Sequence, residues 1–147
     1  MSTPTDEAKR IARQFPEAVA TEGEIDLLDD ILAPDHLEHD PFAGDHTGRE
    51  AAKEQIRSLR EAFPDFRAEV EEIVAEDDVV AMRVTISGTH EGPFMGLEPT
   101  GKSFEVQNMV FTRIEDGRIV ERWLQPDTLG MFRQLGVSLD EMATLTA

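Results

Sequence analysis

Apolar residues near the N-terminus recur three and four positions apart, which is the spacing of an amphipathic helix. The stripe comprises Ala8, Ile11, Ala12, Phe15 and Val19. Pro16 lies inside this stripe, and its ring would displace the hydrogen bond to the carbonyl of Ala12. We therefore expect a helix with a kink or a break at Pro16.

Two shorter apolar stripes follow in the first half of the chain. The first predicts a short helix that ends before Pro34, and it consists of Ile25, Leu28, Ile31 and Leu32. The second predicts a longer helix that ends at Pro64, and it consists of Ala52, Ile56, Leu59 and Phe63. Thr47 and Glu50 have the spacing of a capping box, so this third helix is expected to begin there.

The second half of the chain changes to a period of two, which is typical of strands with one buried face. Residues 79–87 alternate in this way, with Val80, Met82, Val84 and Ile86 on one side. Strands are also expected over 66–76 and 103–114, and a fourth follows the hairpin turn at Asp116-Gly117. Thr128 can cap a terminal helix, which Gly136 is positioned to end.

Helices followed by a meander of strands predict an α+β fold. We expect three N-terminal helices packed on a curved antiparallel sheet, with a short C-terminal helix. No internal repeat or linker is visible, so a single domain over residues 1–147 is expected, with its core at about 8–136. The loop over 92–101 mixes turn formers with bulky apolar side chains, which suits a flap over a pocket mouth.

Strand parity gives a list of candidate site residues. On the last strand, one face is expected to carry Ile119, Glu121, Trp123, Gln125 and Asp127. His90 continues the apolar face of the second strand, and Leu37 and His39 share a side of an extended segment. On the third strand Asn108 shares the face of Phe104 and Val106, and Gln107 takes its place if a bulge shifts the parity. Polar groups that converge in an apolar interior can line a ligand pocket.

Each candidate has a structural alternative. Asp127 directly precedes the last helix and can serve as its N-cap. His90 can be a solvated turn residue at a strand end, and His39 a partly buried histidine without a role in binding. Glu121 can face solvent if its strand is twisted or bulged, and Trp123 can belong to the core. The pair Phe94 and Met95 can seal one end of the fold.

The charge balance excludes several classes of function. The 147 residues include 31 Asp plus Glu against 14 Lys plus Arg, a net charge of −17. Such a chain has no electrostatic attraction for phosphate backbones or anionic lipids, so no nucleic-acid or membrane partner is expected. Lysine occurs only three times, which favours adaptation to a salt-rich cytoplasm over an ordinary acidic composition.

The absence of cysteine excludes disulfides, thiolate nucleophiles and cysteine-based metal sites. Residues 1–7 have no signal-peptide pattern, and the longest apolar run is 79–82, so a cytoplasmic protein is expected. Several residues of metal-ligand type gather in one segment, namely His36, His39, Asp40, Asp45 and His46. We expect no metal site, because His36 and His39 point to opposite faces of a strand and carboxylates are abundant throughout the chain.

Several short motifs occur in a characteristic order along residues 8–136. They are Leu37-Glu38-His39-Asp40-Pro41, Phe63-Pro64-Asp65-Phe66, Gly88-Thr89-His90-Glu91-Gly92, Phe94-Met95-Gly96, Pro99-Thr100-Gly101-Lys102, residues 115–123, Asp127-Thr128-Leu129-Gly130 and Gln134-Leu135-Gly136. In this order the chain resembles the SnoaL-like polyketide cyclases, also called the ester cyclase family.

The resemblance implies a cone-shaped α+β barrel of the kind found in ketosteroid isomerase and nuclear transport factor-like proteins. It also implies an intramolecular aldol condensation that closes a ring of a polyketide ester without a cofactor. Asp127 matches the family's acid/base aspartate, with His90 expected beside it as a second catalytic residue. The substrate-binding residues expected from the resemblance and from strand parity are His39, Phe42, Phe94, Met95, Gln107, Asn108, Met109, Trp123 and Gln125.

The chain has no tyrosine, so an oxyanion hole that uses a tyrosine hydroxyl is excluded, which argues against steroid isomerisation. The alternative to an enzyme is a protein of the same fold that binds a small hydrophobic molecule without converting it. A homodimer is expected through the outer sheet face, where parity places Phe111, Val120 and Leu124 and where relatives in the family pair.

Overall fold

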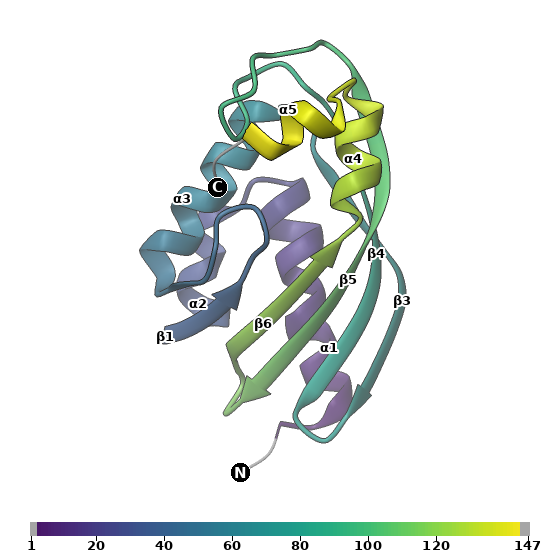
Figure 1. The fold of residues 1–147 in the computed structure, drawn as a ribbon. Coiled ribbons are helices and arrows are strands. Elements are labelled where there is room, and N and C mark those ends of the chain that lie inside the picture. The colour runs from purple at the N-terminus through teal and green to yellow at the C-terminus, as the bar shows by residue number, and fades with distance from the viewer. Residues whose placement is uncertain (1–2, 145–147) are drawn as a thin grey trace.

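The computed structural model describes residues 3–144, and their path is shown in Figure 1. Helix α1, Thr5–Gln14, continues directly into a π-helical turn, η1, Phe15–Thr21. The change of helix type coincides with Pro16, which has no N–H to donate to the preceding turn. The chain is not broken at Pro16: it stays helical and changes from α to π geometry there, and the predicted stripe is buried on both sides of the change.

The next helical segments are short 3-10 and α turns, η2 (Ile25–Leu27) and α2 (Leu28–Ile31), followed later by α3 (Arg49–Ala62). The capping box predicted at Thr47 is wrong. Thr47 belongs to a strand, and its hydroxyl donates to the carbonyl of His36 at 2.8 Å. Gly48 occupies the N-cap position instead, with a positive φ of 93° that glycine adopts without strain.

Six strands form one curved sheet in the order β2-β1-β6-β5-β4-β3. Their bounds are β1 Leu32–His39, β2 His46–Thr47, β3 Arg67–Glu76, β4 Val79–Thr89, β5 Ser103–Glu115 and β6 Arg118–Pro126. Strands β3 to β6 make the predicted antiparallel meander, and the Asp116-Gly117 turn has positive φ at both residues, as expected. The expectation of a purely antiparallel sheet is wrong, because β1 runs parallel to β6. No hairpin joins these two strands, so no turn imposes an antiparallel direction.

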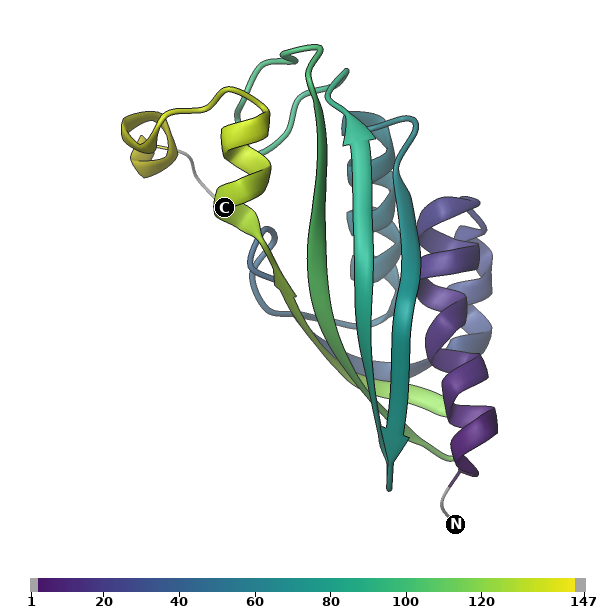
Figure 2. The same cartoon turned by 90° about the vertical axis from the view of Figure 1, so that its right-hand side faces the viewer.

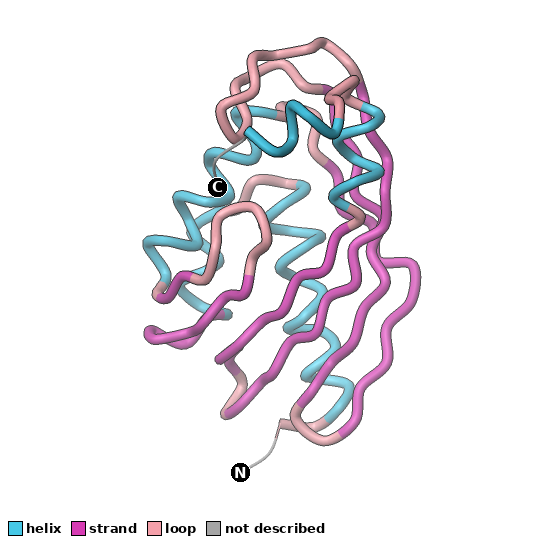
Figure 3. Tube along the Cα trace, viewed as in Figure 1, coloured by secondary structure: helices cyan, strands magenta, loops and turns pink. Residues whose placement is uncertain are grey.

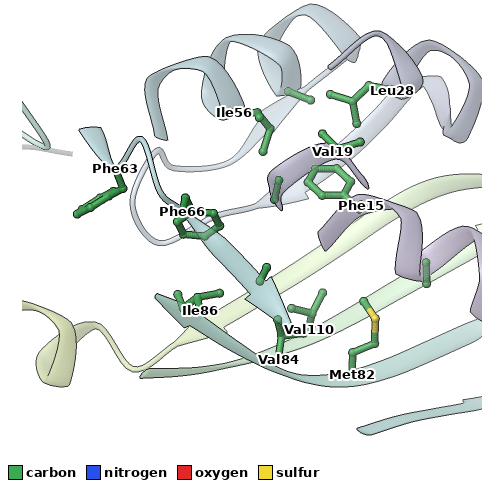
Figure 4. Close-up of a cluster of buried hydrophobic side chains, with 14 of the residues drawn as sticks. Phe15, Val19, Leu28, Ile56, Phe63, Phe66, Met82, Val84, Ile86 and Val110 are labelled. Carbon is green, nitrogen blue, oxygen red and sulfur yellow. The ribbon is translucent and has the colours of Figure 1, made fainter. Parts of the chain in front are cut away.

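Helices α1 to α3 cover one face of the curved sheet, as Figures 1 and 2 show from two directions. The hydrophobic core lies between these layers. Figure 4 shows Phe15 and Ile56 on the helical side, across from Met82, Val84 and Val110 on the sheet. The arrangement is an α+β fold with a mixed six-stranded sheet.

The chain ends with two short helices, α4 (Thr128–Gln134) and α5 (Leu139–Thr144). Asp127, not Thr128, caps α4, because its Oδ1 accepts the backbone N–H of Gly130 at 2.9 Å. Gly136 follows with a φ of 83°, in agreement with its predicted place after the helix. The loop between β4 and β5 lies at the same end of the molecule as α4 (Figure 3). No helix within residues 3–144 is long and apolar enough to cross a membrane.

Candidate active site

One extra residue in β6 decides which side chains face the helices. Ile119 is in register with Ile114 of β5, whereas Glu121 is in register with Arg113, which leaves Val120 as a bulge. Beyond this bulge the two faces of the strand are exchanged. The prediction that Glu121, Trp123, Gln125 and Asp127 share the inner face with Ile119 is therefore wrong.

The inner face of β6 beyond the bulge carries Arg122, Leu124 and Pro126, and all three line an interior cavity of about 90 Å³. Most of the cavity wall is apolar and comes from η1, α3 and the sheet. The polar groups among its lining residues are those of Glu38, Asp40, Gln55, Asn108 and Arg122. Of the residues predicted to bind substrate, Phe42 and Asn108 line this cavity.

Asp40 follows the end of β1 and is 5% exposed. Its Oδ1 accepts the backbone N–H of Phe42 at 2.8 Å and that of Ala43 at 3.4 Å, which holds the carboxyl group in a tight turn. Burial raises the pKa of Asp40, and the nearby charge of Glu38 adds to this effect, although the two backbone hydrogen bonds oppose it. Asp40 is therefore a carboxyl group with increased basicity beside an apolar cavity.

Glu38 and Arg122 form a buried ion pair and line the same cavity as Asp40. They occupy register positions on neighbouring strands, and Arg122 Nη1 donates to Glu38 Oε2 at 2.6 Å. Burial alone would raise the pKa of Glu38, but Arg122, with additional contributions from His36 and His46, holds it below the ordinary value. The guanidinium of Arg122 also lies 3.5 Å from the centre of the Phe15 ring, a cation–π contact.

Asn108 projects from β5 into the same cavity. Its Oδ1 accepts the backbone N–H of Gln125 at 3.1 Å, which fixes the orientation of the amide. The amide nitrogen is then the group left to donate a hydrogen bond to a ligand in the cavity. Parity correctly predicted Asn108 rather than Gln107, because β4 and β5 pair without a shift along this stretch.

His90 is fully buried beneath the loop over 92–101 and lies against Phe63, with ring centres 5.5 Å apart. Its Nδ1 accepts the backbone N–H of Thr100 at 3.2 Å, so the proton of the neutral ring is on Nε2. Burial lowers the pKa of His90 and favours this neutral form. The alternative of a solvated turn residue is wrong, but His90 does not line the interior cavity, and its catalytic role stays a prediction.

Several predicted binding residues lie instead around a hollow of about 360 Å³ on the outer face of the sheet, namely His39, Met109, Trp123 and Gln125. The ring of His39 stacks on Trp123 at 5.4 Å, and its Nε2 lies 2.8 Å from Glu121 Oε2. The hydrogen bonds to Glu121 and Asp45 raise the pKa of His39. Asp40 borders both this outer hollow and the interior cavity.

The remaining predicted residues lie elsewhere. Phe94 is buried against Phe42 and Phe63, at ring distances of 5.4 and 5.2 Å, and the adjacent Met95 is half-buried. This arrangement fits the alternative that the pair seals one end of the fold. Gln107 is exposed. Asp127 is also exposed and caps α4, so it does not line the interior cavity.

Sequence reasoning missed Glu38, Asp40 and Arg122 as the buried charged groups of this site. The alternation of His36, Glu38 and Asp40 carried a usable signal that these three share one side, because residues two apart share a strand face. The bulge that turns Arg122 inward has no such signal, because a valine occupies it and not a glycine. Among the described residues, no group of three or more His, Asp or Glu is placed to hold a metal ion.

Comparisons with known proteins identify relatives along nearly the whole chain. The sequence model of the SnoaL-like polyketide cyclase family matches residues 10–135. The aklanonic acid methyl ester cyclase DnrD of Streptomyces peucetius is 34% identical, with 92% of each chain covered. The nogalonic acid methyl ester cyclase of Streptomyces nogalater is 32% identical over 78% of this chain and 87% of its own.

A solved structure agrees with these relatives. The crystal structure of IdmH from Streptomyces antibioticus superimposes with a TM-score of 0.77 at 35% identity. The match covers 88% of this chain and 99% of IdmH.

Proposed function

The chain belongs to the SnoaL-like polyketide cyclase family, and on that premise we propose that it closes a ring in a polyketide ester by an intramolecular aldol condensation. The observation that carries the proposal is Asp40, a buried carboxyl group of raised pKa beside an apolar cavity. The relatives named as methyl ester cyclases support an ester as substrate.

Asp40 is suited to act as the general base. A carboxylate in an apolar site is a stronger base than one in water, which helps it to remove a proton from the carbon between two carbonyl groups. The electron pair of the broken C–H bond forms the enolate, whose carbon then attacks a second carbonyl of the same molecule. The new C–C bond closes the ring, and the resulting alkoxide takes a proton back. The atoms and electrons balance without a cofactor.

Asn108 is the proposed donor to the enolate oxygen. Its amide nitrogen is available because Oδ1 is held by the backbone of Gln125. A donor fixed in advance inside an apolar cavity stabilises developing negative charge without reorganising during the reaction.

The size of the cavity limits how the substrate binds. Pockets for drug-sized ligands usually measure roughly 300–1,000 Å³, which is larger than the interior cavity here. A cavity of about 90 Å³ accommodates the reacting part of a substrate, and the rest must extend past the rim. We propose that the reacting carbonyl groups enter the cavity beside Asp40.

The test compares two carboxylates, because the family resemblance assigns the acid/base role to Asp127. Asp40→Asn keeps the Oδ1 acceptor of its turn, and Asp127→Asn keeps the acceptor of the α4 cap. Enzyme-dependent exchange of the α-proton of ethyl 2-methylacetoacetate with D2O, followed by NMR, reports proton removal directly. Loss of a general base should lower this rate by about 10²–10⁴-fold.

We expect the loss in Asp40→Asn and little change in Asp127→Asn. The opposite result would transfer the role of base to Asp127 and refute the assignment to Asp40. Binding of the ester without any exchange above background in the unmodified protein would favour the alternative function, that of a binding protein without turnover.

We also propose a homodimer that forms through the outer face of the sheet. Phe111 and Met109 lie two positions apart on β5 and are 53% and 45% exposed on that face. Neighbouring exposed apolar side chains can form part of a protein–protein contact. The bulge turns Leu124 toward the interior cavity, although Leu124 also borders the outer hollow. Phe111→Asp should convert the dimer into a monomer in light scattering, and a monomeric unmodified protein would refute the proposal.

A further inference from the structure

Arg122 is a cavity-lining residue whose donors are only partly used. Its side chain is 5% exposed, and the guanidinium is held on two sides. Phe15 lies against one face of the guanidinium, and Glu38 accepts from Nη1 at 2.6 Å. These contacts fix the direction of the remaining N–H groups, because the guanidinium is planar and rigid.

The Nε–H of Arg122 has no acceptor among residues 3–144, although the nitrogen is fully buried. A buried donor that lacks a partner is costly, and more so in a charged group, because it has lost its hydrogen bonds to water without a replacement. Because Arg122 also lines the interior cavity, an acceptor on a ligand in that cavity can satisfy this donor. We therefore expect a ligand of this cavity to carry a hydrogen-bond acceptor that faces the Nε–H of Arg122.

The charges around Arg122 indicate which kind of acceptor fits. Glu38 already neutralises Arg122 within the same buried cluster, and Asp40 is a second carboxyl group at the cavity wall. His36 also approaches Glu38, with Nε2 and Oε1 3.4 Å apart. An anionic ligand would add a further negative charge next to two carboxyl groups in a low-dielectric site, which is unfavourable. A neutral carbonyl oxygen can accept from Nε–H without this penalty.

We propose that Arg122 binds the neutral ester carbonyl of the substrate through Nε–H, with Glu38 as the residue that positions the guanidinium. Arg122 thereby selects an ester over the corresponding free acid and over a hydrocarbon of the same shape. The inference extends the proposed ring closure by naming the group that orients the substrate relative to Asp40.

The experiment uses unreactive probes, so its result is independent of turnover. Methyl benzoate, benzoate and toluene each contain one flat aromatic ring. Methyl benzoate carries a neutral hydrogen-bond acceptor, benzoate carries an anionic one, and toluene carries none. Their affinities for the unmodified full chain are measured by NMR titration, in which the Nε–H signal of Arg122 is followed directly. Arg122→Lys retains a cation beside Glu38 but removes Nε–H, and it also assigns the signal. Arg83→Lys on the outer side of β4, paired with the exposed Glu72, is the matched control.

We expect methyl benzoate to bind about tenfold more tightly than toluene, because a hydrogen bond to a charged donor strengthens binding by about that factor or more. We expect about the same preference over benzoate, because the benzoate charge is repelled by the carboxyl groups of the cavity. Methyl benzoate should shift the Arg122 Nε–H signal and toluene should not. In Arg122→Lys the preference for methyl benzoate should disappear while toluene affinity is retained, and Arg83→Lys should behave like the unmodified protein.

Equal affinity for methyl benzoate and toluene in the unmodified protein, or an unchanged Nε–H signal, would overturn the proposal. This comparison needs no variant, so it decides the question even if Arg122→Lys fails to fold. If the aldol chemistry is absent but methyl benzoate still shifts the Arg122 signal, the proposed function fails and the binding role of Arg122 stands.

Discussion

The buried pair of Glu38 and Arg122 allows a stringent test of the electrostatics of the site. Both residues are nearly inaccessible, at 3% and 4% exposure, and their charged atoms are 2.6 Å apart. Arg122→Met removes the cation and leaves a buried carboxylate whose other close partner is His36 at 3.4 Å. Breaking a buried pair in this way costs about 3–5 kcal/mol, a large share of the roughly 5–15 kcal/mol that stabilises an ordinary domain.

The double variant Glu38→Gln/Arg122→Met removes both charges and keeps the approximate volumes. It should be destabilised by less than Arg122→Met alone, because no unpaired charge remains buried. Urea unfolding at constant salt gives the free energies, and the cycle of single and double variants gives the coupling between the two side chains, which we expect to exceed about 2 kcal/mol. Additive losses in the cycle would refute the view that the two charges depend on each other.

The same pair sets a pH dependence with a defined sign. The pKa of Glu38 is lowered in the native state, so the unfolded chain binds the proton more readily. The resulting stability is complete above the unfolded pKa of about 4.3 and is lost as the pH falls through the lower native value. In the double variant this acid-sensitive part should be missing. If both proteins lose the same amount of stability as the pH falls, the attribution of this loss to Glu38 is contradicted.

Three other outcomes are expected. Asp40→Asn should raise the free energy of unfolding at neutral pH by roughly 0.5–2 kcal/mol, because the raised native pKa means that ionised Asp40 destabilises the fold. This gain in the free energy of unfolding, measured by urea unfolding, should vanish below the unfolded pKa of about 3.9. No gain at pH 7 would contradict a raised native pKa of Asp40. Glu121 and Asp45 raise the pKa of His39, so the contribution of His39 to the free energy of unfolding is full below about pH 6.5 and is lost as the pH rises through its native pKa. This contribution is less than about 1 kcal/mol because the pair is accessible to solvent, and His39→Gln should abolish the change with pH. The net charge of −17 predicts that the midpoint of thermal unfolding rises between about 0.1 M and about 2 M KCl as repulsion is screened, and a flat profile would argue against adaptation to salt.

Much of the secondary structure could be predicted because it depends on local patterns. The buried stripe around Pro16, the period-two strands and the Asp116-Gly117 turn each follow from side-chain spacing or from backbone preference. Asn108 was placed correctly for the same reason, since β5 runs in continuous register with β4 past that residue. The parallel pairing of β1 with β6 could not be predicted, because it joins segments about 80 residues apart without a connecting hairpin.

The site itself was harder to predict because it depends on where single residues interrupt regular structure. Asp127 was expected on the inner face of β6, and the structure uses it to cap α4, where its carboxylate meets a helix N-terminus. His90 was expected at the cavity, and the loop over 92–101 instead encloses it away from the cavity lining. The cap agrees with the alternative interpretation of Asp127 as the residue that precedes the last helix. The enclosure of His90, in contrast, depends on tertiary contacts that residue spacing does not contain.

The bulge at Val120 links the fold to the chemistry of the site. In a regular strand Glu121 and Trp123 would share the face of Ile119, and Arg122 would point to the outer surface. With the bulge, Arg122 turns inward at the register position where β1 presents Glu38, so each side chain finds its counter-charge. Burial of either charge alone would be strongly unfavourable, hence the bulge in β6 and the alternation in β1 must occur together. The same exchange of faces takes Trp123 out of the cavity and brings Leu124 in, which leaves the cavity wall apolar except for the few polar groups that can act on a carbonyl compound.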